Sequence, residues 1–234
     1  MQDVLGASPV IEALRANIGR LMGRVRGSSR LPPVLIQGET GTGKGLVAGL
    51  LHRTGPRAGG PFVAVNCAAI PEGLLEAELF GFERGAFTDA KQAKPGLFQT
   101  AHRGVLFLDE VGLLPAALQA KLLNAIEEGS VRRLGSTRSE RIDVWIISAS
   151  NVDLRAAILE RRFREDLYQR LAGLTLSLPP LRERGDDVIM LAEHYLARAS
   201  ADFSLPPRTL TPEARARLRG YRWPGNVREL ANLM

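Results

Sequence analysis

The glycine-rich segment GETGTGKG, at residues 38–45, holds the residue types best suited to bind a phosphate group. Its first seven positions fit the pattern G-x-x-x-x-G-K-[ST], in which backbone N–H groups surround the phosphates of a nucleotide and the lysine adds positive charge. Gly45 stands where the pattern has a Ser or Thr that contacts magnesium, and the helix expected to begin there adds its dipole. A glycine-rich turn without a ligand is the alternative. The predicted nucleotide-binding residues are Gly38, Glu39, Thr40, Gly41, Thr42, Gly43, Lys44 and Gly45.

Two adjacent acids, Asp109 and Glu110, follow the apolar run VLFL at residues 105–108. Ligands of parallel sheets bind at the carboxyl ends of the strands, so we expect these acids to lie beside the glycine-rich segment. Asp109 would orient hydrated Mg²⁺ and Glu110 would activate the attacking water, which predicts hydrolysis of a nucleoside triphosphate. Acids at the start of a helix are the alternative, because they are favourable there.

Apolar runs of strand type alternate with helical patterns, and these elements must position the groups above. Strands that are apolar throughout and separated by helices predict an α/β fold, with a parallel sheet sandwiched by helices on both faces. All four runs are therefore expected to be buried strands. The runs are residues 34–37, 61–66, 105–110 and 142–150.

The pattern divides the chain into three parts. Residues 1–173 are expected to form the α/β nucleotide-binding subdomain. Residues 174–184 contain two prolines and are interpreted as a linker, or as a last strand followed by a loop. Residues 185–234 predict a small C-terminal helical lid, and because its last helix stops at Met234 we expect this lid to be truncated.

Composition places the chain among globular proteins: 45% of its 234 residues are hydrophobic and 24% are charged. It has no apolar run of about 18 residues and no secretory signal pattern, so we predict a cytoplasmic location without membrane contact. The single cysteine, Cys67, excludes a disulfide framework. The net charge of +6 permits a nucleic-acid partner, but acids accompany many arginines, as in RERGDD at 182–187, and favour an ordinary solvated surface.

The stretch ELFGFERGAFTDA, at residues 78–90, resembles the ELFGHEKGAFTGA signature of sigma-54-dependent transcriptional activators, also called bacterial enhancer-binding proteins. These proteins are AAA+ ATPases, so the resemblance implies an AAA+ P-loop NTPase fold with ATP and Mg²⁺ as cofactors. It further implies a ring that remodels the sigma-54 RNA polymerase holoenzyme, opens promoters and activates transcription. Other blocks agree in order along the chain: GETGTGKG (38–45), NCAAI (66–70), GVLFLDEV (104–111), FREDLYQRL (163–171), LPPLRER (178–184) and WPGNVREL (223–230).

The resemblance also implies roles for polar residues around the nucleotide. Asn66 would hydrogen-bond Glu110 and hold it away from water, as a glutamate switch, although an Asn that caps the next helix is nearly as good an interpretation. Ser150 and Asn151 match the sensor I position, which would respond to the γ-phosphate. Arg228 matches sensor II, which reaches from the lid to the nucleotide of its own subunit.

Arg164 and Arg170, in FREDLYQR, are by resemblance arginine fingers presented to the ATP of a neighbouring subunit. An arginine supplied in trans neutralises charge that develops in the transition state. Such fingers make sense only in a ring, so a homo-hexamer or heptamer is implied. Ordinary surface ion pairs with Glu165 or Asp166 are the alternative.

The GAFTDA segment (residues 85–90) is, by resemblance, the contact with sigma-54. Phe87 at a loop tip suggests packing on a partner, whereas a buried phenylalanine in an ordinary turn is the alternative. Asp89 replaces the second glycine of the signature. An arginine-rich loop (residues 127–141) is expected either to steer this segment or to face promoter DNA. The expected contact residues are Gly85, Ala86, Phe87, Thr88, Asp89 and Ala90.

Two other functions remain open from the sequence. One is an AAA+ nucleic-acid motor, which would itself bind DNA strongly and in a salt-dependent manner. The other is a nucleotide-gated regulatory or assembly domain with impaired hydrolysis, suggested by Gly45 and Asp89. If the chain is an activator, the resemblance implies that DNA is bound by a helix-turn-helix domain outside it.

Overall fold

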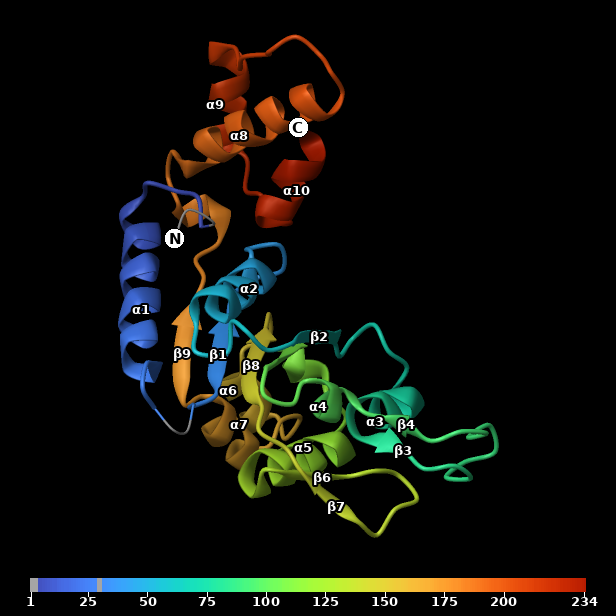
Figure 1. The fold of residues 1–234 in the computed structure, drawn as a ribbon. Helices are drawn as coiled ribbons and strands as arrows, with labels where there is room; N and C mark the ends of the chain where they lie inside the picture. The colour runs from blue at the N-terminus through green and yellow to red at the C-terminus, as the bar shows by residue number, and fades with distance from the viewer. Residues whose placement is uncertain (1–3, 29–30) are drawn as a thin grey trace.

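The computed structural model describes residues 4–28 and 31–234, and its centre is a five-stranded parallel sheet in the order β2-β5-β8-β1-β9 (Figure 1). The strands of this sheet are β1 (Val34–Gln37), β2 (Phe62–Asn66), β5 (Val105–Asp109), β8 (Trp145–Ser150) and β9 (Leu174–Ser177). Two short antiparallel ribbons lie outside it: β3 (Gly81–Phe82) with β4 (Lys94–Pro95), and β6 (Ser130–Arg132) with β7 (Ser139–Arg141).

Helices surround the sheet and continue into the lid. Those of the sheet domain are α1 (Pro9–Val25), α2 (Lys44–Thr54), α3 (Glu72–Phe80), α4 (Leu97–Thr100), α5 (Ala116–Glu128), α6 (Leu154–Leu159) and α7 (Glu165–Leu171), with the 3-10 turn η1 (Val111–Leu113). The lid contains the 3-10 turn η2 (Leu181–Glu183) and the helices α8 (Asp187–Asp202), α9 (Pro212–Gly220) and α10 (Asn226–Leu233). In the part of the chain described, no helix combines the length and the apolar character needed to cross a membrane.

Alternation along the strands builds two apolar layers, one on each face of the sheet. In β5, Val105 and Phe107 join the core that includes α1 and α2, whereas Leu106 and Leu108 join the core that includes α3, α5 and α7. Because side chains of a strand point alternately to opposite faces, a strand covered on both sides must be apolar throughout. The predicted parallel sheet between helices is therefore confirmed.

The prediction that residues 61–66 form a buried strand is wrong. β2 lies at one edge of the sheet, where Phe62 is 36% exposed and only Val65 is buried. A strand at the edge of a sheet has a neighbouring strand on one side only, so its apolar side chains can remain partly exposed to solvent.

Residues 174–177 form β9, the strand at the other edge of the sheet, paired in parallel with β1. Of the two interpretations of residues 174–184, the last strand followed by a loop is the correct one. The loop then passes through Pro179 and Pro180 into η2 and the lid.

The lid has a core of its own and lies beyond the carboxyl ends of β1 and β9, as Figure 1 shows. Asp187, 3% exposed at the start of α8, ties it to the segment before α1. Its carboxylate accepts hydrogen bonds from the backbone N–H groups of Ala7 (2.6 Å) and Ser8 (2.9 Å). The lid is thus held directly above the edge of the sheet where ligands of such folds bind.

Candidate active site

The predicted phosphate-binding segment forms the turn between β1 and α2, with Lys44 as the first residue of the helix. The Lys44 side chain is 6% exposed, and its Nζ donates hydrogen bonds to the carbonyls of Gly38 (2.8 Å) and Glu39 (3.2 Å). Burial lowers the pKa of Lys44, and the charge of nearby Glu110 opposes that shift. The Lys44 ammonium group is therefore held at the centre of the turn, where it can bind a phosphate group.

The lid supplies hydrogen-bond donors to the next three carbonyls of this turn. No peptide bond among the described residues is cis, and in a trans peptide the C=O and N–H groups point in opposite directions. Carbonyls held toward the lid therefore leave the following N–H groups facing the other way, as phosphate binding requires. The contacts are Asn226 Nδ2 to the Thr40 carbonyl (3.0 Å), Arg228 N to the Gly41 carbonyl (3.2 Å) and Arg184 Nη2 to the Thr42 carbonyl (3.0 Å).

Two glycines of the turn have conformations that a side chain would disturb. Gly41 has φ +80°, and a Cβ atom there would lie 2.1 Å from the carbonyl oxygen of Gly225 in the lid. Gly43 has φ +104°, and a Cβ atom on it would meet nothing within 4 Å. Gly41 thus permits the close approach of the lid, and Gly43 borders open space of the kind that a phosphate group occupies.

Asp109 and Glu110 lie at the end of β5, next to Lys44 as predicted. Glu110 Oε1 is 3.8 Å from Lys44 Nζ, and Glu110 Oε2 accepts a hydrogen bond from the backbone N–H of Asn151 at 3.2 Å. Asp109 Oδ1 accepts from the N–H of Glu110 at 3.0 Å. Glu110 itself has φ +55°, a left-handed conformation that is uncommon for non-glycine residues.

The two residues at the end of β8 have different surroundings. Asn151 Nδ2 donates to Thr40 Oγ1 of the phosphate-binding turn at 2.9 Å, so its amide lies where a sensor of the γ-phosphate is expected. Ser150 is 1% exposed, and its hydroxyl donates to the carbonyl of Val152 at 2.8 Å. Ser150 contributes to the turn through its backbone, because its carbonyl accepts from the N–H of Gly38 at 3.2 Å.

The hydrogen bond expected between Asn66 and Glu110 is not formed in the described structure. Asn66 pairs in register with Asp109, but its Oδ1 accepts a hydrogen bond from the N–H of Ala68 at 2.9 Å. This local turn satisfies the backbone that follows β2, but it does not cap the next helix, because α3 begins at Glu72 with Pro71 as its N-cap residue. The Glu110 carboxylate instead contacts Lys44 and Asn151.

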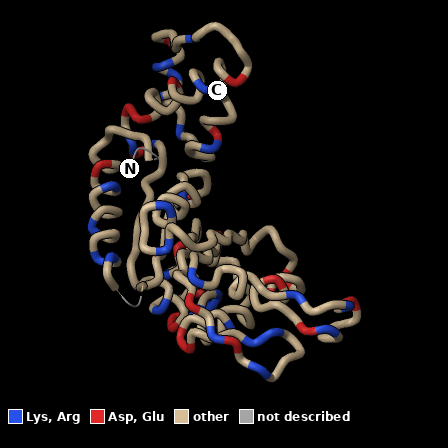
Figure 2. The backbone as a smooth tube through the Cα atoms, in the orientation of Figure 1, with Lys and Arg blue, Asp and Glu red and all other residues tan. Residues whose placement is uncertain are grey.

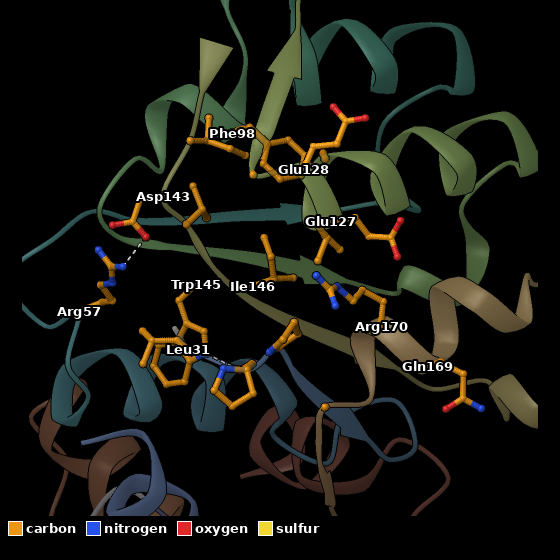
Figure 3. Close-up of a pocket in the computed structure, with 18 residues that line it drawn as sticks. Leu31, Arg57, Phe98, Glu127, Glu128, Asp143, Trp145, Ile146, Gln169 and Arg170 are labelled. Atoms are coloured by element: carbon orange, nitrogen blue, oxygen red, sulfur yellow. Dashed lines mark hydrogen bonds and ion pairs between the residues drawn. The ribbon is translucent and has the colours of Figure 1, made fainter. Parts of the chain in front are cut away.

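The structure separates the two predicted finger arginines. Arg164 precedes α7, and its exposed guanidinium pairs with Asp166 at 2.6 and 2.9 Å. Arg170 points into a cavity of about 840 Å³ lined by residues that precede β1, β8 and β9 (Figure 3). Its Nε atom is buried and has no hydrogen-bond partner among the described residues. Arg170 therefore lies at the amino ends of the strands, opposite the phosphate-binding turn.

Arg228 is a further point of contact between the lid and the nucleotide site. Besides its backbone contact with Gly41, its guanidinium is close enough that its charge, together with burial, lowers the pKa of Lys44. The exposed Arg228 side chain thus lies on the side of the site expected for sensor II.

The GAFTDA segment forms a closed turn outside the sheet. The N–H of Gly85 donates to the carbonyl of Ala90 at 2.8 Å, and the N–H of Ala90 donates to that of Phe87 at 2.9 Å. The Phe87 ring is 39% exposed and lies 4.9 Å from the ring of Phe82. Ala90 closes the turn and is only 4% exposed, so Phe87 presents a larger surface to a partner than Ala90 does.

The arginine-rich loop, which contains β6 and β7, lies against the base of the GAFTDA segment. Leu134 accepts a backbone hydrogen bond from Glu83 and donates one to Gly81, each at 2.9 Å. Arg133 lies 3.5 Å from Glu83 and 3.0 Å from Glu140. These contacts favour the interpretation that this loop steers the GAFTDA segment. Figure 2 shows several basic positions on this loop, and basic and acidic positions alternate on the lid.

Comparisons with known proteins agree with this arrangement. A family model described as the sigma-54 interaction domain matches residues 4–177, and a model described as the AAA+ ATPase lid domain matches residues 182–234. The chain belongs to the sigma-54 interaction domain family. It is an AAA+ ATPase domain of the kind found in sigma-54-dependent activators of transcription, as the GAFTDA signature implied.

Relatives of this sigma-54 interaction domain include a response regulator and a transcription regulator. Response regulator protein PilR of Pseudomonas aeruginosa is 50% identical over 231 residues, which cover 99% of this chain and 51% of that protein. Anaerobic nitric oxide reductase transcription regulator NorR of Salmonella agona is 48% identical over 227 residues, covering 97% of this chain and 44% of NorR. The chain spans about half the length of these curated relatives.

Solved structures resemble this sigma-54 interaction domain along nearly its whole length. A crystal structure of NtrX from Brucella abortus matches with a TM-score of 0.88 and 36% identity, covering 99% of this chain and 51% of NtrX. NtrX in complex with ATP matches with a TM-score of 0.87 and 36% identity, over 97% of this chain and 48% of NtrX. Hsp104 of S. cerevisiae, at 19% identity and a TM-score of 0.63, covers 99% of this chain and 44% of its own, and shows the fold alone.

Sequence reasoning assigned no role to three residues that the structure brings to the phosphate-binding turn: Arg182, Arg184 and Asn226. Arg182 binds the Glu39 carboxylate through two hydrogen bonds, at 2.6 and 2.8 Å, and Asn226 donates to the same carboxylate at 3.1 Å. All three belong to LPPLRER and WPGNVREL, two of the blocks that carry the family resemblance. Their place in these two blocks is the sequence feature that could have pointed to a role at the site.

Acid will weaken the contact between the lid and the phosphate-binding turn. Hydrogen bonds from Arg182 and then Asn226 lower the pKa of Glu39 from 4.5 to about 2. The unfolded chain therefore binds a proton near pH 4.5, whereas the folded protein does so only near 2, and the stabilisation present above pH 4.5 is lost as the pH falls through this interval. Because the pair is partly exposed, we expect the loss to be below about 1 kcal/mol.

The measurement is the free energy of urea unfolding between pH 6 and pH 2, for wild type and Glu39→Gln. The difference between them should shrink below pH 4.5. Glu183→Gln, which removes an exposed carboxylate of η2, serves as the matched control and should leave the acid dependence of the wild type unchanged. Parallel curves for wild type and Glu39→Gln would contradict the role of this ion pair.

Proposed function

We propose that this domain assembles into a hexameric or heptameric ring in the cytoplasm and uses ATP hydrolysis to remodel sigma-54 RNA polymerase, which opens promoters. The observation that carries the proposal is that the phosphate-binding turn, Lys44 and Glu110 meet at the carboxyl ends of the strands. Arg170 lies at the amino ends of the strands, on the other side of the domain. By resemblance, an arginine finger of a neighbouring chain completes this ATP site, and such a finger requires a ring.

The residues present suit a triphosphate that carries its own magnesium ion. The described part of the chain contains no cluster of three or more acidic, His or Cys side chains that would hold a metal alone. Mg²⁺ is usually held in such sites by one or two carboxylates together with the substrate phosphates, and Asp109 is the residue placed to supply one. When bound, Mg²⁺ would neutralise part of the charge on the β- and γ-phosphates.

Glu110 is the proposed general base that activates the attacking water. Its carboxylate contacts Lys44 at 3.8 Å and accepts a hydrogen bond from the N–H of Asn151 at 3.2 Å. A triphosphate that attracts Lys44 removes one of these two contacts and leaves Glu110 free to accept a proton. Asn151, which also contacts Thr40, is placed to link this change to the phosphate-binding turn.

Arg164 is the proposed finger for the neighbouring subunit's ATP. Its guanidinium is held by Asp166 in an exposed ion pair, in which both side chains are 48% exposed. Exposed ion pairs of this kind stabilise by about 0–1 kcal/mol, so the arginine is readily released to a more strongly charged phosphate group. Arg170, which is half-buried and lines its cavity together with Glu127, suits a role in shaping the subunit interface (Figure 3).

The GAFTDA segment is the proposed contact with sigma-54, and Phe87 is its centre. The exposed ring already packs on Phe82, which connects to Leu134 of the arginine-rich loop through a β-bridge. The two loops therefore form one unit that nucleotide-dependent movement can raise or lower as a whole. DNA recognition, by resemblance, belongs to a domain outside residues 1–234.

Three substitutions test the assigned ATPase roles. We expect Lys44→Ala and Glu110→Gln to lower ATP turnover ~10²–10⁴-fold, through loss of phosphate binding and of the base respectively. Arg164→Ala should lower turnover roughly 10³–10⁵-fold at a protein concentration where rings form. The assay is steady-state phosphate release, with ring formation followed by sedimentation.

Arg162→Ala is the matched control, because this arginine is also exposed, pairs with Glu160, and lies two positions from Arg164. It should retain wild-type turnover. Wild-type turnover in all three active-site variants would show that the site has been assigned to the wrong residues.

Phe87→Ala should separate ATP hydrolysis from promoter opening. Turnover should stay within about twofold of wild type, whereas open-complex formation by sigma-54 polymerase should fall about 30-fold, as expected on removing an aromatic contact worth about 2 kcal/mol. Phe203→Ala in the lid, where the ring is 75% exposed, should change neither activity. Equal promoter opening by Phe87→Ala and wild type would exclude the proposed contact.

A further inference from the structure

Gln119 is a polar side chain buried in the sheet domain, 1% exposed on α5. Its Nε2 donates hydrogen bonds to the carbonyls of Leu114 (2.8 Å) and Arg162 (2.9 Å), and its Oε1 accepts one from the N–H of Arg164 (2.8 Å). Both amide protons and the amide oxygen are therefore used, and each partner is a backbone group. A buried amide with every group paired holds its partners in a narrow range of positions.

Two of these three partners, Arg162 and Arg164, flank Phe163. Residues 162–164, which carry the proposed arginine finger, form the finger segment. Phe163, between Arg162 and Arg164, is 4% exposed, and its N–H and that of Arg162 both donate to the carbonyl of Ala157. The segment is thus held from beneath by Gln119 and by α6, while both arginine side chains remain exposed. Gln119 fixes the direction in which Arg164 leaves the backbone without touching its guanidinium.

The third partner belongs to the segment that follows the proposed base. The N–H of Leu113 donates to the carbonyl of Glu110 at 3.0 Å, and the N–H of Leu114 donates to that of Val111 at 3.2 Å. These bonds form the compact turn η1 between Glu110 and the start of α5. Gln119 therefore joins residues 162–164 to the hydrogen-bonded turn that follows Glu110.

We propose that Gln119 is a positioning residue for the arginine finger: it fixes the backbone at Arg164 so that the guanidinium reaches the ATP of the neighbouring subunit. This inference rests on the proposed function, in which Arg164 acts in trans. If the Gln119 amide only stabilised its own subunit, its loss would impair whichever subunit carried the substitution. A positioning residue acts only in the subunit that supplies the finger, and this difference can be measured.

The experiment uses mixed rings of two inactive variants. Lys44→Ala supplies an intact finger without a working site, and Arg164→Ala supplies an intact site without a finger. Mixed with Lys44→Ala in excess, they should recover ATP turnover at the Arg164→Ala sites. Gln119→Leu, which removes all three hydrogen bonds, is then added to one partner at a time.

In the finger-supplying Lys44→Ala subunit, we expect Gln119→Leu to lower the recovered kcat roughly 10–100-fold, since a displaced catalytic group of this kind costs about that much. The KM for ATP should stay unchanged, because the residues that bind ATP belong to the other subunit. In the Arg164→Ala subunit, the same substitution should change recovered turnover less than about twofold. This second mixture also reports on folding, since a misfolded Gln119→Leu chain would fail in both places.

The outcomes separate the positioning role of Gln119 from the action of Arg164 in trans. Equal effects of Gln119→Leu in both partners, or no effect in either, would overturn the positioning role while leaving the trans finger intact. Failure of the parent mixture to recover any turnover would overturn the trans finger itself, and the positioning role with it.

Discussion

The orientation of the peptide groups in residues 38–43 is the constraint on which the rest of the structure depends. Each carbonyl in this turn has a donor: Lys44 takes the first two, the lid takes the next three, and α2 takes the last through the N–H of Val47. Except at Thr42, whose N–H donates to the Glu39 carbonyl at 3.3 Å, satisfied carbonyls keep the following N–H groups facing a possible anion. A flexible glycine-rich segment thereby becomes a defined binding surface before any nucleotide arrives.

This constraint explains why the lid has to lie where it does. Asn226, completely buried with φ +52°, reaches both the Glu39 carboxylate and the Thr40 carbonyl, while its Oδ1 accepts the N–H of Leu181. Arg184 is 4% exposed and is bound to backbone carbonyls only, including those of Thr42 and Pro179. Movement of the lid must therefore disturb the phosphate-binding turn, and binding at the turn must affect the lid.

Much of this architecture could be predicted from the sequence, because local pattern determines it. The glycine-rich turn, the acids after residues 105–108 and the parallel sheet all follow from spacing and apolar runs. The exposure of β2 could not be predicted, because an edge strand and a central strand have similar apolar runs. The contacts of Asn66 and the burial of Ala90 depend on how single turns close, which spacing does not determine.

The long-range contacts were beyond sequence reasoning for another reason. Gln119 with Arg164, and Asn226 with Thr40, join residues 45 and 186 positions apart. Asn226 lies in a block that carries the family resemblance, but the block does not reveal which distant residue its side chain contacts. These contacts became visible only when the fold brought the helices and turns together.

The most direct measurement of the central claim is hydrogen exchange at the backbone amides of residues 40–44, with and without a non-hydrolysable ATP analogue. The account predicts marked slowing of exchange at these amides on binding, with weaker slowing in Asn226→Gly, which keeps the backbone conformation but removes the donor to Thr40. Unchanged exchange at these amides, while an independent assay shows the analogue bound, would contradict it.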